Sequence, residues 1–220
     1  MPASRLTLPE ELVLLALDDE SGRWIPMPAF AVEIALGAAI VMELMLSERV
    51  GMEAEQLRLR DATATGDPIL DAALAELAAD GTPRPATAWM SRFGGTDSDL
   101  ATRVAARLVE RGILRSEDTR LLWAFRKRTY PAASGVEERE VRARLLHLLY
   151  SDEVPDIRDA LLVGLLRSTR LIEQLVGERE HHQLRHRVDA IAEREEISRA
   201  MRRTLDELHI LMATPQFGML

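Results

Sequence analysis

AFAVEIALGAAIVMELML, residues 29–46, is the stretch that decides the fold, because it is long and almost wholly apolar. A membrane-spanning helix needs about 20 predominantly apolar residues, and a charge near its centre costs a few kcal/mol. This stretch is shorter, rich in alanine, and contains Glu33 and Glu43. A helix that is apolar on nearly all sides is typical of a globular core. We therefore predict a buried central helix here, in preference to a membrane span or an interfacial segment.

The composition agrees with a globular protein that has a helical core. Of the 220 residues, 47% are hydrophobic and 29% are charged, which is enough apolar material for a sizeable core. The chain has no cysteine, so disulfides and cysteine-bound zinc are excluded. Its start lacks a signal-peptide pattern, and we expect a cytoplasmic protein. The net charge of −8 disfavours nucleic acid as a partner.

Capping and periodicity signals predict the elements around the central helix. Thr7 and Glu10 have the spacing of a capping box before an apolar run, and Asp67 is suited to cap a helix that runs through Leu77. Alternating apolar residues predict a short strand pair within 50–59 and a hairpin at 120–131. Further helices are predicted at about 98–111, 136–150, 156–176 and 178–212. The expected fold is mainly α: a single-domain helical bundle, residues 1–220, built around the central helix with minor β-hairpins.

Two groups of residues were considered for catalysis or metal binding. Glu33 and Glu43 are ten positions apart and share roughly one helical face, so they are either a catalytic carboxylate pair or buried acids that meet an arginine or a backbone cap. His182 and His186 lie one helical turn apart, near His181, which suits either a metal ion or a solvated helix face. The structural interpretation is the stronger one in both cases. We expect no metal, no cofactor and no enzyme activity.

Basic residues gather in two places that suit either a solvated surface or a docking patch for phosphates or an acidic partner. Arg103, Arg107 and Arg111 recur along one face of a predicted helix, and Arg126, Lys127 and Arg128 follow one another in the predicted hairpin. Trp24 follows Arg23 in a predicted loop, where an indole either inserts at a lipid interface or covers the core.

Several segments resemble the Golgi phosphoprotein 3 family. They are LTLPEELVLLALDD at the start, MELML at the end of the central helix, ATGDPILDAAL at 64–74, RLVERGIL at 107–114, and the following LLWAF. The resemblance implies one mostly α domain around a very hydrophobic central helix. Eukaryotic members bind phosphatidylinositol 4-phosphate on Golgi membranes and act as adaptors that retain glycosyltransferases. In some members a projecting β-hairpin serves oligomerisation. The arginine- and alanine-rich composition is similar to that of bacterial members.

The resemblance does not carry the family's phosphate-binding residues onto this chain. The family's arginines align with Gly37, Ser98 and Ala101, and its tryptophan aligns near Met27, or with Trp24 if the loop is shifted. Each missing guanidinium removes a charge-assisted hydrogen bond worth about 1.5–3 kcal/mol. Arg103 matches a family arginine outside the set that binds the phosphate.

Two functions are therefore expected. The first is a non-catalytic module that binds anionic phospholipid headgroups of the phosphoinositide type, peripherally at the inner face of a membrane. Its candidate lipid-binding residues are Arg23, Trp24, Arg103 and Arg107. The alternative is a cytoplasmic adaptor that forms homo-oligomers or binds an unidentified protein through the 120–131 hairpin, without specific phosphoinositide binding. Its candidate contact residues are Trp123, Phe125, Arg126, Lys127 and Arg128.

Overall fold

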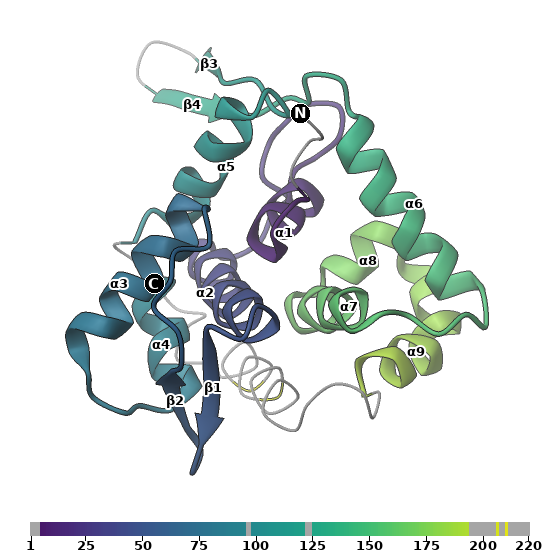
Figure 1. The fold of residues 1–220 in the computed structure, drawn as a ribbon. Coiled ribbons are helices and arrows are strands. Elements are labelled where there is room, and N and C mark those ends of the chain that lie inside the picture. Colours follow the sequence, from purple (N-terminus) through teal and green to yellow (C-terminus); the bar gives the residue numbers. More distant parts are fainter. Residues whose placement is uncertain (1–4, 96–97, 122–124, 194–205, 207–209, 211–220) are drawn as a thin grey trace.

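The computed structural model describes residues 5–95, 98–121, 125–193, 206 and 210, and it is mainly α with two small β-hairpins. The central helix α2 (Ala29–Leu46) passes through the middle of the molecule (Figure 1). Leu36, Ala38 and Val41 on this helix have no exposed surface at all. The predicted core helix is confirmed with its predicted bounds. In the part of the chain that the structure describes, no helix is both long and apolar enough to cross a membrane.

Helices enclose α2 on both sides. One side holds α3 (Pro68–Asp80), α4 (Ala86–Phe93) and α5 (Leu100–Glu110) (Figure 1). The other side holds α6 (Val136–Tyr150), α7 (Ile157–Thr169), α8 (Leu171–Val176) and α9 (Glu178–Ala192). Helix α1 (Leu8–Ala16) lies between the two groups and contacts α2, α5, α6 and α7. Each buried Leu or Val contributes about 1.5–3 kcal/mol.

Helix α1 starts as its sequence predicts. The Thr7 hydroxyl accepts a hydrogen bond from the Glu10 amide at 3.4 Å, and the Glu10 carboxylate accepts one from the Thr7 amide at 2.9 Å. Every residue of α1 is buried, including Glu10 and Glu11. Two buried acids at the start of one helix require cationic partners, and these partners come from other helices.

Two glycines let α2 and α4 cross at close range. A Cβ atom on Gly37 would come within 2.2 Å of the Met90 carbonyl oxygen, and one on Gly94 within 1.9 Å of the Glu33 carbonyl oxygen. Only residues without a side chain fit at this crossing. A side chain at position 37 would force the two helices apart.

Both predicted hairpins are present. Strands β1 (Val50–Glu53) and β2 (Gln56–Leu59) pair in antiparallel register, with Val50 opposite Leu59. Strands β3 (Glu117–Leu121) and β4 (Phe125–Thr129) form the second hairpin, which projects beyond α5 in Figure 1. Its base is fixed by backbone hydrogen bonds from Arg115 to Pro131 and from Ala133 to Ile113.

Three predicted helix bounds were wrong. The helix expected from about residue 98 starts at Leu100. The helix expected over 156–176 is two helices, because Arg170 adopts a left-handed conformation with φ of 60° between α7 and α8. Neither Gly nor Pro marks that break, so the apolar pattern runs through it. Helix α9 ends at Ala192, and most of the helix expected to reach 212 lies outside the described residues.

Candidate functional site

Several candidate site residues lie on α5. The first turn of this helix meets α2, and its last turn meets the hairpin base. Helix α5 has no cap from its own N-cap residue, Asp99, which is in a left-handed conformation. Glu33 of α2 supplies the cap instead. Its carboxylate accepts hydrogen bonds from the Leu100 amide at 2.9 Å, the Ala101 amide at 3.2 Å and the Ser98 hydroxyl at 2.8 Å.

This contact determines what the start of α5 can bind. A helix N-terminus attracts anions because its free amides and its dipole face them. Here the chain's own carboxylate occupies these amides, next to Ser98 and Ala101. An incoming phosphate would meet a fixed negative charge in this place. The start of α5 is therefore closed to anionic ligands.

A hollow of about 230 Å³ lies beside this helix start, and we call it the Arg103 hollow. Its lining comes from α2, α3, α4, α5 and the segment before α5: Ile40, Ile69, Ala72, Ala73, Glu76, Arg92, Phe93, Ser98, Leu100 and Arg103. Ile40, Phe93 and Leu100 are buried, so the floor of the hollow is apolar. The combination of an apolar floor and charged side chains suits an amphiphilic ligand.

The two arginines of the Arg103 hollow differ in whether they form ion pairs with described residues. Arg92 binds the carboxylates of Glu76 and Asp80, and its guanidinium lies 5.2 Å from the centre of the Trp89 ring. Arg103 is exposed, and no described residue forms an ion pair with it. Arg103 therefore offers the charge in this hollow that is free to meet a ligand. Sequence reasoning did not single out Arg92.

Arg107 on α5 and Arg111 at its C-cap are engaged in ion pairs. Arg107 lies 3.9 Å from Asp67 and 3.3 Å from Glu110, and Arg111 binds the buried carboxylate of Glu10. The three-arginine face predicted from the sequence is thus two ion-paired side chains, Arg107 and Arg111, and one arginine, Arg103, that has no ion-pair partner among the described residues. The lipid-binding roles of Arg103 and Arg107 stay predictions.

Trp24 and Arg23 lie at the base of the β3–β4 hairpin. The Tyr130 amide donates to the Gly22 carbonyl at 2.7 Å, and the Trp24 ring meets the Tyr130 ring edge-on at 6.3 Å between centres. Trp24 is half-buried against the core, whereas Arg23 is exposed. The indole thus packs against the core. The lipid-binding roles of Arg23 and Trp24 stay predictions.

The predicted contact residues of the hairpin are placed only in part. Phe125, Arg126, Lys127 and Arg128 belong to β4, and the register sets Arg126 opposite Arg120 and Arg128 opposite Asp118. Trp123 lies outside the described residues. The interaction role of this hairpin stays a prediction.

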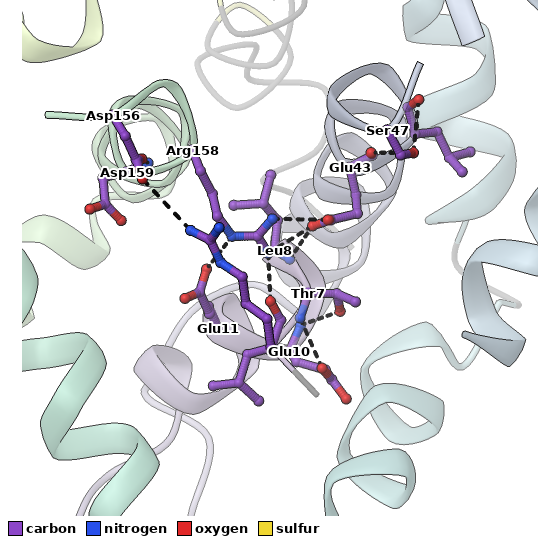
Figure 2. A network of polar contacts seen from close by, with 12 residues as sticks. Thr7, Leu8, Glu10, Glu11, Glu43, Ser47, Asp156, Arg158 and Asp159 are labelled. Atoms are coloured by element: carbon purple, nitrogen blue, oxygen red, sulfur yellow. Dashed lines mark hydrogen bonds and ion pairs between the residues drawn. The ribbon is translucent and has the colours of Figure 1, made fainter. Parts of the chain in front are cut away.

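The acids of α2 are engaged in structural contacts. Arg158 of α7 donates to both oxygens of Glu43 at 2.9 Å and to the Leu6 carbonyl at 2.6 Å, and the Leu8 amide donates to Glu43 at 2.6 Å (Figure 2). Glu43 thus meets an arginine, and Glu33 meets a backbone cap. Neither acid lines the Arg103 hollow. The carboxylate pair considered for catalysis is therefore part of the framework.

The network around Arg158 includes further acids that carry raised pKa values. Arg158 lies 3.3 Å from Glu11, and Arg144 binds Glu11 at 2.7 Å and Asp159 at 2.9 Å. Burial raises the pKa of Glu11 and that of Asp159, although the neighbouring guanidiniums lower both pKa values.

The histidines considered for metal binding lie on α9. His182 and His186 are exposed, and within the described ranges no cluster of three potential ligands suits a metal ion.

Comparison with known proteins agrees with this architecture. The family model described as Golgi phosphoprotein 3 (GPP34) matches residues 8–208. The chain belongs to the Golgi phosphoprotein 3 family. It is also similar to vacuolar protein sorting-associated protein 74 of Schizosaccharomyces pombe, with 26% identity over 193 residues, which covers 76% of this chain and 56% of that protein. The chain thus spans little more than half the length of this relative.

Membership of the Golgi phosphoprotein 3 family confirms the resemblance found in the sequence, and it fits the observed helical fold. The family consists in general of binding and trafficking proteins without enzyme activity, and the structural engagement of Glu33 and Glu43 fits this description.

Proposed function

We propose that this protein is a non-catalytic module that attaches peripherally to membranes by binding anionic phospholipid headgroups at the Arg103 hollow. The observation that carries the proposal is the exposed guanidinium of Arg103, which forms no ion pair with any residue that the structure describes, beside an apolar floor. An exposed guanidinium can donate two parallel hydrogen bonds to one phosphate. The apolar floor gives room for the glycerol and the first methylenes of a lipid. We propose the inner face of a membrane as the place of attachment.

The closed start of α5 limits how selective this binding can be. The family's arginine positions hold Gly37, Ser98 and Ala101, and Glu33 occupies the nearby amides. One free guanidinium attracts any phosphate, but it cannot fix the position of a second phosphate on an inositol ring. We therefore expect weak binding that falls with salt and that depends on the charge of the vesicle. The net charge of −8 weakens it further.

Vesicle co-sedimentation of the full chain tests the proposal. Vesicles of phosphatidylglycerol mixed with neutral lipid are compared with neutral vesicles at low and moderate salt. Wild-type protein is expected to sediment with the anionic vesicles, and Arg103→Ser to lose about fivefold in apparent affinity, since one basic side chain near an anionic surface contributes about 1 kcal/mol. Arg179→Ser is the matched control, because Arg179 is also an exposed arginine but lies on α9. Equal loss in both variants, or no sedimentation of the wild type, would contradict the proposal.

The β3–β4 hairpin supports a second candidate, self-association or docking of a protein partner. Within the described residues β3 and β4 pair only with each other, so each strand has an outer edge with unpaired backbone groups. Such an edge readily pairs with a strand of another chain. Failure to bind vesicles, together with concentration-dependent association in analytical ultracentrifugation, would favour this candidate.

A further inference from the structure

The loop that follows α1 is closed on itself by hydrogen bonds, and we call residues 18–23 the 18–23 loop. The Asp18 amide donates to the Arg23 carbonyl at 2.7 Å, and the Gly22 amide donates to the Asp18 carbonyl at 2.8 Å. The Ser21 amide and hydroxyl both donate to the Asp18 carboxylate, at 2.9 Å and 2.5 Å. These bonds give the loop a fixed shape. None of its residues lines the Arg103 hollow, so the inference drawn from it is independent of the proposed function.

One side of the 18–23 loop is joined to the base of the β3–β4 hairpin. The Tyr130 amide donates to the Gly22 carbonyl at 2.7 Å, and the Trp24 ring, directly after the loop, meets the Tyr130 ring edge-on. A Cβ atom on Gly22 would lie 2.2 Å from the backbone nitrogen of Pro131, so the two backbones are in direct contact. A displacement of the loop would therefore disturb the base of the hairpin.

The other side of the 18–23 loop is joined to α6 by one guanidinium that two acids share. The Nη2 atom of Arg142 donates to Asp19 at 2.8 Å and to Glu138 at 3.3 Å, and its Nε atom also donates to Glu138 at 3.3 Å. Asp19 is exposed on the loop, whereas Glu138 is buried on α6. A single positive charge cannot balance two carboxylates, and two acids that share a site do not both ionise without cost.

Charged groups on the other elements that pack against α6 do not relieve this imbalance. Helix α6 contacts α1, α8 and α9. Charged side chains on these helices have partners of their own: Glu10 and Glu11 of α1 bind Arg111 and Arg144, Glu173 of α8 lies 3.8 Å from His181, and Arg187 of α9 donates to the Leu148 carbonyl. On the loop, Glu20 and Arg23 are exposed. Within the described residues, Asp19 and Arg142 are thus the charged groups that contact Glu138.

A proton shared between the two acids removes the excess negative charge. Protonated Glu138 donates a hydrogen bond to Asp19, and Arg142 then faces one carboxylate. Burial, together with the hydrogen bond and the charge of Asp19, raises the pKa of Glu138 to about 7, against 4.5 for an ordinary glutamate. When Glu138 ionises, it stays in place because it is buried on a helix. Asp19 is on an exposed loop, so it is the acid that can turn into water.

We propose that the 18–23 loop attaches the base of the β3–β4 hairpin to α6 in a pH-dependent way: the loop is held while Glu138 is protonated, and it is released when both acids are ionised. The proton is taken up from solution, so no ligand or partner is needed. The element that responds is the hairpin, because its base lies on the other side of the loop.

Hydrogen exchange of the full chain, followed by NMR at about pH 6 and about pH 8, tests the inference. Each exchange rate is divided by the rate of an unstructured amide at the same pH, which gives a protection factor. The protection factors of the Gly22 and Tyr130 amides should fall about tenfold between the two conditions, because the held loop binds the proton more tightly than the released loop. The Gly177 amide, which donates to the Glu173 carbonyl at the end of α8, is the reference and should not change.

Three variants separate the shared proton from other causes. Glu138→Gln keeps a hydrogen-bond donor toward Asp19 at every pH, and Asp19→Asn removes the second carboxylate, so both should have the same protection factors in the two conditions. Glu140→Gln removes an exposed acid from the same helix, and it should keep the fall seen in the wild type. Three results would each overturn the inference: constant protection in the wild type, an undiminished fall in Glu138→Gln and Asp19→Asn, or an equal fall at Gly177.

Discussion

The two ends of α2 satisfy a carboxylate in opposite ways. Near the end of the helix, Glu43 is held by the guanidinium of Arg158 from α7. Near its start, Glu33 is held by backbone amides of α5 and by the Ser98 hydroxyl. The first contact is an ion pair inside the protein. The second places the negative charge of Glu33 at the positive, N-terminal end of the α5 dipole. The difference teaches that acids in an apolar helix can be structural, and that one of them can occupy the free amides at the start of another helix.

The largest effect is expected at Arg158. Arg158→Met leaves Glu43 buried without its cation, and removal of one partner of a buried ion pair costs about 3–5 kcal/mol. Urea unfolding measures the free energy of unfolding. The double variant Arg158→Met/Glu43→Met removes both charges and should recover much of this loss. A loss below about 1 kcal/mol in the single variant would show that Arg158 is not the main partner of Glu43.

An intermediate effect is expected at Glu138 of α6, which shares the guanidinium of Arg142 with Asp19. Burial and the adjacent Asp19 raise the pKa of Glu138 to about 7, against 4.5 for an ordinary glutamate. Between these values the folded protein binds more protons than the unfolded chain, so stability falls as the pH rises through this window, by about 2–3 kcal/mol.

Urea unfolding from acidic to neutral pH checks the prediction at Glu138, with Glu138→Gln as the comparison. The variant should show a shallower fall. Some slope remains in the variant, because Glu11 and Asp159 also have raised pKa values. Parallel pH profiles of the two proteins would mean that Glu138 titrates as an ordinary glutamate.

The smallest effect on stability is expected at Glu33. Glu33→Gln keeps the shape of the side chain but removes the charge from the start of α5, and loss of a cap costs about 1–2 kcal/mol. Hydrogen exchange should speed up at the amides of Leu100 and Ala101. Glu180→Gln, which removes an exposed acid from α9, provides the control. Unchanged exchange at these two amides would show that the α5 cap does not depend on the carboxylate.

The sequence predicts which kind of contact a residue makes better than it predicts which residue is the partner. The bounds of α2, the capping box at Thr7 and both hairpins follow from local patterns. That Glu33 and Glu43 would meet a backbone cap or an arginine follows from the cost of burying a charge. Their partners lie 67 and 115 positions away in the chain, and no periodicity specifies such pairs.

The candidate sites show the same limit. Arg103 and Arg23 are exposed, as their sequence context predicts. The ion pair of Arg107 with Asp67 could not be predicted, because it depends on how α3 packs against α5. The half-burial of Trp24 depends on Tyr130, which is more than a hundred residues away. Similarly, the residues that line a hollow of about 370 Å³ beside α1 come from three separate segments of the chain. Tertiary contacts therefore decide which charges remain free for a ligand.

The most direct test of the proposed function compares two kinds of vesicle at equal surface charge in the co-sedimentation assay. One kind contains phosphatidylinositol 4-phosphate and the other contains phosphatidylglycerol. Glu33 closes the start of α5, and within the described part of the chain Arg103 is the arginine of the hollow without an ion pair. The protein should therefore bind both kinds of vesicle equally, and salt should weaken both to the same extent. A strong preference for phosphatidylinositol 4-phosphate would contradict this account and would require a specific phosphate site elsewhere in the chain.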